Sequence, residues 1–117
     1  MTTTNNQTEQ IRALNDQFRS SFDPNLGRVI LTGGVQNLPR NQLQQLLQAV
    51  KKFSEFNSEN NPYLENDMGR IELFDSSFFW KIDYLHRQHW QQDIGSDDPA
   101  DVQKTLRVMT IMFTSEY

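Results

Sequence analysis

The sequence predicts an α+β fold in which a small antiparallel sheet of three strands, including a hairpin, packs against about three α-helices. Two observations predict it. Apolar side chains recur at helical spacing near residues 11–22 and 43–53, and residues 70–83 alternate in a way that allows the segment to pair with itself. The 117 residues suit one domain. We expect that domain to span residues 8–117 and to follow a disordered tail, residues 1–7.

The first helix is predicted to begin at Thr8, whose hydroxyl can cap it, and its apolar face follows at steps of three or four residues. That face consists of Ile11, Leu14, Phe18 and Phe22. Turn-forming residues in segment 23–27 end this helix. Residues 28–32 are mostly β-branched or apolar, which predicts a short, largely buried strand that ends at a tight Gly33-Gly34 turn.

The second predicted helix runs from an Asn37 cap to Phe53, with Pro39 in the first turn, where a missing N–H does no harm. Its leucines and valine form one stripe, and its glutamines and lysines lie outside that stripe. Residues 54–68 are polar and contain the Asn60-Asn61-Pro62 segment, so we expect a long loop there. A loop of this length in a small domain is often functional or mobile.

A hairpin is predicted over residues 70–83, with Ser76-Ser77 as its two-residue turn. This register places apolar pairs on one side of the ribbon, and one aromatic and two opposite-charge pairs on the other. The pairs are Leu73–Trp80, Ile71–Ile82, Phe74–Phe79, Glu72–Lys81 and Arg70–Asp83. A slip by one residue would move every side chain to the other face, so the pattern specifies the register.

The last segment allows two interpretations. Asp98 followed by Pro99 is typical of a helix start, so a third helix is predicted after a polar loop over residues 86–97. Apolar residues at helical spacing support it, namely Val102, Leu106, Met109 and Phe113. The alternation over residues 107–114 also fits a strand, and the cap and the stripe make helix our prediction.

Composition excludes several function classes. The chain has no cysteine, which excludes a disulfide scaffold and a thiolate site and suits a reducing compartment, so we expect a cytoplasmic protein. No stretch approaches the apolar length of a membrane span, and the N-terminus lacks the pattern of a secretory signal. The formal net charge is −4 and the basic residues are scattered. We therefore expect neither membrane association nor direct nucleic-acid binding.

His86 and His89 form the only His-x-x-His of the chain. Two imidazoles at this spacing can share a metal on a helix, but here they follow a predicted strand and enter a loop. Two surface histidines are therefore the expected interpretation. A metal site completed by Asp83 and Asp93 is the alternative. A small metal-dependent hydrolase would combine His86, His89 and Asp83 with loop carboxylates such as Glu65 and Asp67. No cofactor motif is present, and no cofactor is predicted.

In the predicted register, Phe74 and Phe79 stand together on the side of the hairpin that carries Lys81 and Asp83. If nothing covers that side, an aromatic pair rimmed by charges is typical of a protein-binding site. The alternative is that a loop or the first helix covers the pair. Trp90 in the polar loop likewise either pins the loop to the core or contacts a partner. Tyr63, Glu65 and Asp67 of the long loop complete the candidate binding surface.

Four segments carry a resemblance to a known family. They are Ile-Arg-Ala-Leu-Asn-Asp (11–16), Gly-Arg-Val-Ile-Leu-Thr-Gly-Gly-Val (27–35), Phe-Trp-Lys-Ile-Asp-Tyr (79–84) and Thr-Ile-Met-Phe-Thr-Ser-Glu-Tyr (110–117). Over residues 9–117 the chain resembles an uncharacterised bacterial family, domain of unknown function 3768. The resemblance implies an accessory gene of a plasmid, phage or integrated element, and it implies no site residues. Relatives tend to carry Asp, His and Phe where this chain has Asn61, Asn66 and Met68.

These observations predict a small, acidic, non-enzymatic protein-binding module. The mobile-element context of the resemblance suggests an accessory or anti-defence protein, of inhibitor type, that acts on a host protein. The hydrolase built on His86 and His89 is the rival from another class. A third interpretation is a subunit whose exposed patch makes a homodimer. An enzyme needs its titratable groups to converge in one pocket, whereas a binding module needs an exposed apolar patch.

Overall fold

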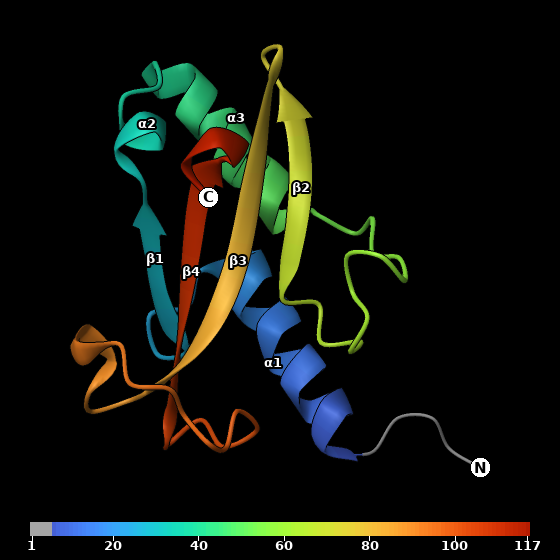
Figure 1. Ribbon diagram of the computed structural model, residues 1–117, viewed down its shortest axis with the longest axis vertical. Helices are drawn as coiled ribbons and strands as arrows, with labels where there is room; N and C mark the ends of the chain where they lie inside the picture. Colours follow the sequence, from blue (N-terminus) through green and yellow to red (C-terminus); the bar gives the residue numbers. More distant parts are fainter. Residues whose placement is uncertain (1–5) are drawn as a thin grey trace.

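The computed structural model describes residues 6–117 and shows an α+β fold built on a four-stranded mixed sheet (Figure 1). In chain order the elements are α1 (Asn6–Ser21), β1 (Gly27–Leu31), α2 (Gly33–Gln36), α3 (Arg40–Lys51), β2 (Met68–Leu73), β3 (Ser76–His86), the 3-10 helix η1 (Trp90–Gln92), β4 (Thr105–Phe113) and the 3-10 helix η2 (Thr114–Glu116). The order across the sheet is β1-β4-β3-β2. Strand β4 runs parallel to β1 and antiparallel to β3.

The prediction of a third helix in the last segment is wrong, because residues 105–113 form β4 in the interior of the sheet. The sequence of a strand that is paired on both sides and covered on both faces is a nearly continuous apolar run. Such a run also has apolar residues at the spacing of a helix. The cap residues serve a turn instead: the Asp101 N–H donates to the Asp98 carbonyl at 3.0 Å, with Pro99 at the second position. The sheet therefore has four strands rather than three.

The hairpin is confirmed, but its predicted turn and pairs are wrong. Phe74 and Asp75 form the two-residue turn with φ of 55° and 56°, and Leu73 pairs with Ser76. Positive φ at both central residues is the type I′ geometry that suits the twist of paired strands. A phenylalanine gives no sequence signal for such a turn, whereas the two serines give a misleading one.

The true register shifts the pairing by an even number of residues, so each side chain keeps its predicted face while its partner changes. Ile71 pairs with Phe78, Gly69 with Trp80, and Arg70 with Phe79. The predicted cross-strand pairs Phe74–Phe79, Glu72–Lys81 and Arg70–Asp83 do not form.

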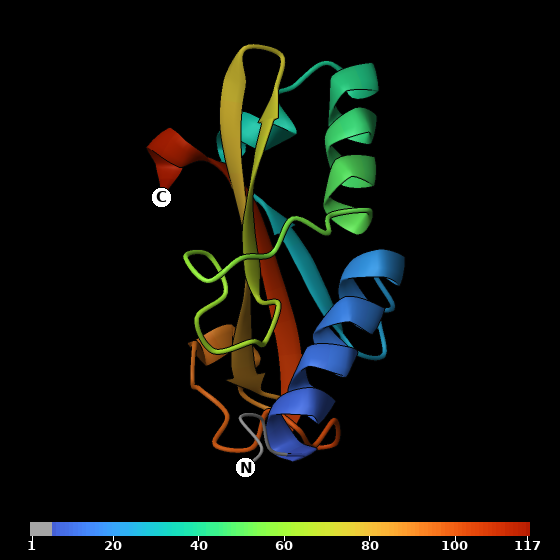
Figure 2. The same cartoon turned by 90° about the vertical axis from the view of Figure 1, so that its right-hand side faces the viewer.

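Helices α1 and α3 cover one face of the sheet, and the main core lies between them and the strands (Figure 2). Its buried members are Phe18, Leu26, Val35, Leu46, Val50, Phe53, Ile71, Phe78, Trp80, Ile82, Met109 and Ile111. Both helices use the apolar stripes that the sequence predicts. We call the opposite face of the sheet the open face.

The remaining predictions differ in detail. Helix α1 already includes Asn6 and Gln7, whereas residues 1–5 of the predicted tail lie outside the described residues. Helix α3 has Pro39 at its N-cap rather than in its first turn. The long loop is confirmed, because residues 54–67 contain no helix or strand.

Candidate functional site

The open face carries three of the predicted binding residues. Phe79, Lys81 and Asp83 alternate along β3 and point away from the core, on the same side as Thr110 of β4 and Ile30 of β1. In Figure 2 no helix covers the middle of this face; η2 lies at one end and the segment around η1 at the other. The prediction that these residues share a face away from Ile71 and Trp80 is confirmed.

The aromatic pair of the open face is not the predicted one. The ring of Phe79 lies edge-to-face with that of Tyr117, with centroids 5.5 Å apart and planes at 68°. Tyr117 is 77% exposed, and Ile30 on the same face is 42% exposed. No pattern in the sequence indicates that residues after β4 fold back onto this face, so Tyr117 is not among the predicted site residues.

Phe74 has a different environment from Phe79. It occupies the hairpin turn, and its partly buried ring packs against the main core, with the Phe78 centroid 6.5 Å away. The predicted pair of Phe74 and Phe79 therefore does not form, and of the two environments considered for it, Phe74 has the covered one. A residue in the turn cannot share the alternation of the strand, which is why the misplaced turn also misplaced the pair.

The charges of the open face are paired along single strands. The Lys81 ammonium lies 2.6 Å from the Asp83 carboxylate, and the Arg70 Nε lies 2.8 Å from that of Glu72. Ser77 joins the second pair, accepting from Arg70 at 3.0 Å and donating to Glu72 at 2.6 Å. These hydrogen bonds hold the pKa of Glu72 below its usual value. Ionic pairs of this kind position side chains around the aromatic pair more than they stabilise the fold.

Trp90 lies in η1 and is half-buried against a second, smaller cluster on the open face, formed by Leu85, Leu106 and Val108. It therefore pins the segment after β3 to the sheet, one of the two roles predicted for it. His86 and His89 lie just before it, with ring centroids 4.7 Å apart. Among residues 6–117 no group of three or more His, Cys, Asp or Glu side chains is placed to hold a metal ion.

The predicted loop residues separate into two groups. Tyr63 is 79% exposed at the surface of the long loop. Glu65 instead turns toward the sheet, where its carboxylate accepts a hydrogen bond from the Tyr84 hydroxyl at 2.6 Å. The loop is also tied to α1, because the Arg12 guanidinium donates to the Leu64 carbonyl at 3.0 Å.

Glu65 belongs to a buried polar cluster that the sequence did not reveal, formed with Asn15, Tyr84 and Arg107. Asn15 is fully buried and donates to the Tyr84 hydroxyl at 2.8 Å and to the Glu65 carbonyl at 2.9 Å. The side-chain oxygen of Asn15 accepts from Arg107 Nε at 2.6 Å, and Arg107 also donates to the backbone carbonyl of Pro99. The sequence contains one signal of this cluster, namely a polar residue inside each of two apolar patterns. These residues are Asn15 in the first helix and Arg107 in the last strand.

Burial shifts the pKa of several groups in and beside this cluster. Desolvation raises the pKa of Asp67, with further contributions from the carboxylates of Glu65 and Asp83. Desolvation also raises the pKa of the Tyr84 phenol and lowers that of Arg107. Perturbed groups mark candidate sites when they line a pocket. None of these groups lines either of the two surface hollows described below, and their hydrogen bonds join α1, the long loop and the sheet into one unit.

Two positions singled out by the family resemblance are neighbours in space. Asn61 donates to the Asn66 side-chain oxygen at 2.7 Å, and Asn66 donates to the Asp16 carboxylate at 3.0 Å. Asp16 also pairs with Arg19 at 2.9 Å. In this chain both central members are neutral amides, which lack the basicity for general acid–base chemistry.

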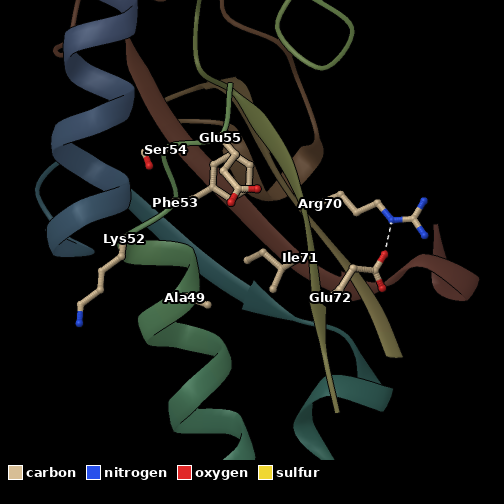
Figure 3. A pocket seen from close by; sticks show the side chains of 8 residues that line it. All are labelled: Ala49, Lys52, Phe53, Ser54, Glu55, Arg70, Ile71 and Glu72. Carbon is tan, nitrogen blue, oxygen red and sulfur yellow. Dashed lines mark hydrogen bonds and ion pairs between the residues drawn. The ribbon is translucent and has the colours of Figure 1, made fainter. Parts of the chain in front are cut away.

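A hollow of about 420 Å³ lies between α3 and β2. Figure 3 shows Phe53 and Ile71 lining it, while Arg70 and Glu72 point away from α3. A second hollow continues along the glutamines of α3, between Asn41 and Lys52, as far as Leu73. Both hollows follow the β2 edge of the sheet.

Glu116 in η2 closes the other end of the sheet. Its carboxylate accepts from the Thr32 hydroxyl at 2.6 Å and from the backbone N–H groups of Phe113 and Gly34, each at 2.9 Å. These bonds lower its pKa. A side chain on Gly34 would lie 2.7 Å from the carboxylate, which explains the glycine there.

Comparison with known proteins gives a family and no function. None of the helices in residues 6–117 is long and apolar enough to span a membrane. No curated protein and no solved structure matches the chain. The family model of the proteins of unknown function DUF3768 matches residues 31–116. This match covers most of the chain, including the strands of the sheet after β1, the long loop and Glu116, and the chain therefore belongs to the DUF3768 family.

Proposed function

We propose that the protein is a non-enzymatic binding module that docks on another protein through the open face of its sheet. The observation that carries this proposal is the aromatic pair of the half-buried Phe79 and the exposed Tyr117, on a face whose middle no helix covers. Aromatic side chains surrounded by polar groups are the usual anchors of protein interfaces. The polar rim is present here as the Lys81–Asp83 and Arg70–Glu72 pairs.

The chemistry of the partner follows from this surface. The partner presents an apolar side chain to Tyr117 and Ile30. Its polar groups meet the rim of the open face, where each charged side chain already has a partner of opposite charge. The net charge of −4, with exposed Asp93 and Asp97 beyond the η1 end of the face, favours a partner that is basic at its periphery. The family resemblance supports a host protein as that partner, and an accessory or anti-defence role in a mobile genetic element.

No observation favours the hydrolase alternative strongly enough to make it a second proposal. Glu65 is engaged by Tyr84, and Lys81 and Asp83 form a pair on the open face. The hydrolase thus stays a prediction of the sequence.

The test is a quantitative affinity capture from host lysate that compares the wild type with Tyr117→Ser and with Ile30→Ser. The matched control is Tyr63→Ser, because Tyr63 is as exposed as Tyr117, at 79% against 77%, but lies on the long loop. We expect a captured protein to be lost with both open-face variants and retained with the control. Circular dichroism melts confirm that all variants fold.

Capture that is equal for all four proteins would place the partner elsewhere, and failure to capture any protein from lysates of several hosts would refute the proposal. The double variant of Phe74 and Phe79 is unsuitable for this purpose. Phe74 packs against the core, so its replacement would test folding rather than binding.

A further inference from the structure

Strand β2 is the last strand on its side of the sheet, and its outer edge is unpaired within residues 6–117. The Ile82 N–H donates to the Asp67 carbonyl at 2.8 Å, and Leu73 pairs with Ser76 at the turn. In an antiparallel ladder, residue pairs that exchange backbone hydrogen bonds alternate with pairs that do not. The odd-numbered residues of β2 therefore form the backbone hydrogen bonds to β3. The backbone N–H and C=O groups of Arg70 and Glu72 therefore point outward from the sheet.

This edge is accessible. Figure 2 looks onto it and shows the long loop crossing in front of its lower end, while the part that leads to the hairpin turn is uncovered. Natural proteins usually protect such an edge with a bulge, a proline, charged side chains or a covering loop. Residues 68–73 form regular pairs and contain no proline. Their two charges have opposite signs.

The sequence of the exposed edge is complementary to itself. Arg70 and Glu72 flank Ile71 symmetrically, and their side chains are 59% and 62% exposed. When two such strands run antiparallel about a two-fold axis at Ile71, each arginine lies opposite a glutamate. Opposite charges directly across a ladder stabilise it, and like charges destabilise it.

We propose that a second copy of this chain pairs with β2 along this edge, so that two four-stranded sheets join into one. Ile71 lies opposite Ile71 of the second copy, and Arg70 lies opposite Glu72 of the second copy. The outward backbone groups of these two residues form the bonded pairs of the new ladder. Such two-fold contacts are the commonest way in which soluble proteins self-associate.

The core side of the edge fits the same register. Leu73 of the second copy lies opposite Gly69, which has no side chain, and beside the hollow that Phe53 and Ile71 line. The interface thus has charge pairs on the open face and apolar contacts on the helix face. This proposal concerns the β2 edge. It shares Arg70 and Glu72 with the rim of the open face, but Phe79, Tyr117 and Ile30 take no part in it, so the two proposals are tested by different variants.

The test measures mass against concentration by sedimentation equilibrium, from the 13.8 kDa of one chain to twice that mass. Arg70→Glu places glutamate opposite glutamate at two symmetric positions, and Glu72→Arg places arginine opposite arginine. Each single variant weakens the dimer by at least about tenfold, because the change acts twice. The double variant Arg70→Glu/Glu72→Arg restores complementary charges and the dimer.

A mixture of the two single variants gives the sharpest readout. One chain then carries two acids and the other two bases, so heterodimers form at concentrations where each variant alone is monomeric. Both positions are exposed, and unchanged circular dichroism spectra show that the variants fold. A wild type that stays at 13.8 kDa at all concentrations overturns the proposal. So does a dimer that is insensitive to these charges, since its interface lies elsewhere.

Discussion

The fully buried Asn15 is the residue whose replacement tests the architecture most directly. It joins three elements through three hydrogen bonds: to Tyr84 in β3, to the backbone of Glu65 in the loop, and to Arg107 in β4. We consider Asn15→Ala, which keeps α1 helical and removes all three bonds. The arginine then keeps its charge in the interior without the acceptor at its Nε, and its second terminal nitrogen already has no hydrogen-bond partner.

The expected loss follows from these contacts. Two neutral hydrogen bonds contribute about 1 kcal/mol each, and the bond from the charged Arg107 contributes about 1.5–3 kcal/mol. The higher helix propensity of alanine returns about 0.6 kcal/mol. We therefore expect Asn15→Ala to lower the free energy of unfolding by about 3–4 kcal/mol, a large part of the stability of a small domain.

The assay is urea unfolding followed by far-UV circular dichroism and by the fluorescence of the tryptophans, of which Trp80 is fully buried. Gln17→Ala, an exposed amide on the same helix, is the control and should change stability by less than about 0.5 kcal/mol. Arg107→Met and the double variant complete a double-mutant cycle. A coupling free energy of about 2 kcal/mol is expected, and additivity within about 0.5 kcal/mol would refute the reasoning.

Three further predictions concern other contacts. Gly69→Ala should destabilise the protein in urea by about 1–3 kcal/mol, because the new methyl group would lie 2.6 Å from the Phe53 ring; an unchanged midpoint would contradict this. Glu116→Gln should lower the melting temperature at pH 7. The carboxylate has a lowered pKa, so its contribution is present above the unfolded pKa and the difference from wild type should disappear as the pH falls through the folded pKa; a pH-independent difference would count against the cap. Asp67→Asn should raise the melting temperature at pH 7. Burial raises the Asp67 pKa, so the wild type loses stability as the pH rises from the unfolded pKa through the folded one. A difference in melting temperature between variant and wild type that is the same at pH 7 and at pH 3 would show that burial of this carboxylate has no cost.

The helices and the faces of the hairpin could be predicted from sequence because each depends on local periodicity. The stripes of α1 and α3 repeat at helical spacing, and the side chains of β2 and β3 alternate. When the register shifts by an even number of residues, each side chain stays on the same face of the sheet. The predicted face of Phe79, Lys81 and Asp83 is therefore correct although their predicted cross-strand partners are not.

Strand β4 and the hairpin turn could not be predicted because long-range packing decides them. A strand buried on both faces loses its alternation, so residues 105–113 matched a helical stripe as well as a strand. The turn at Phe74 is unfavourable locally, and it is compensated by pairing Ile71 with Phe78 and by placing Gly69 opposite the bulky Trp80.

The candidate site was only partly predictable for a related reason. Tyr117 reaches the open face only because η2 folds back over the sheet, and the buried polar cluster joins Asn15 to Arg107 across 92 positions of sequence. Contacts between segments this far apart leave no periodic pattern. Their one local trace is a polar residue where the pattern calls for an apolar one.

The position of β4 has a consequence for how the chain folds as it is synthesised. Strand β4 separates β1 from β3, so the sheet cannot assemble until residues 105–113 have left the ribosome. Until then β2 and β3 are the only strands that can pair, because the parallel partner of β1 lies eighty residues downstream. A growing chain therefore leaves β1 unpaired for most of its synthesis, and the inner edge of β3 from the end of that strand until β4 emerges. Chains with this strand order complete their sheet late, and until then such edges can pair with other chains.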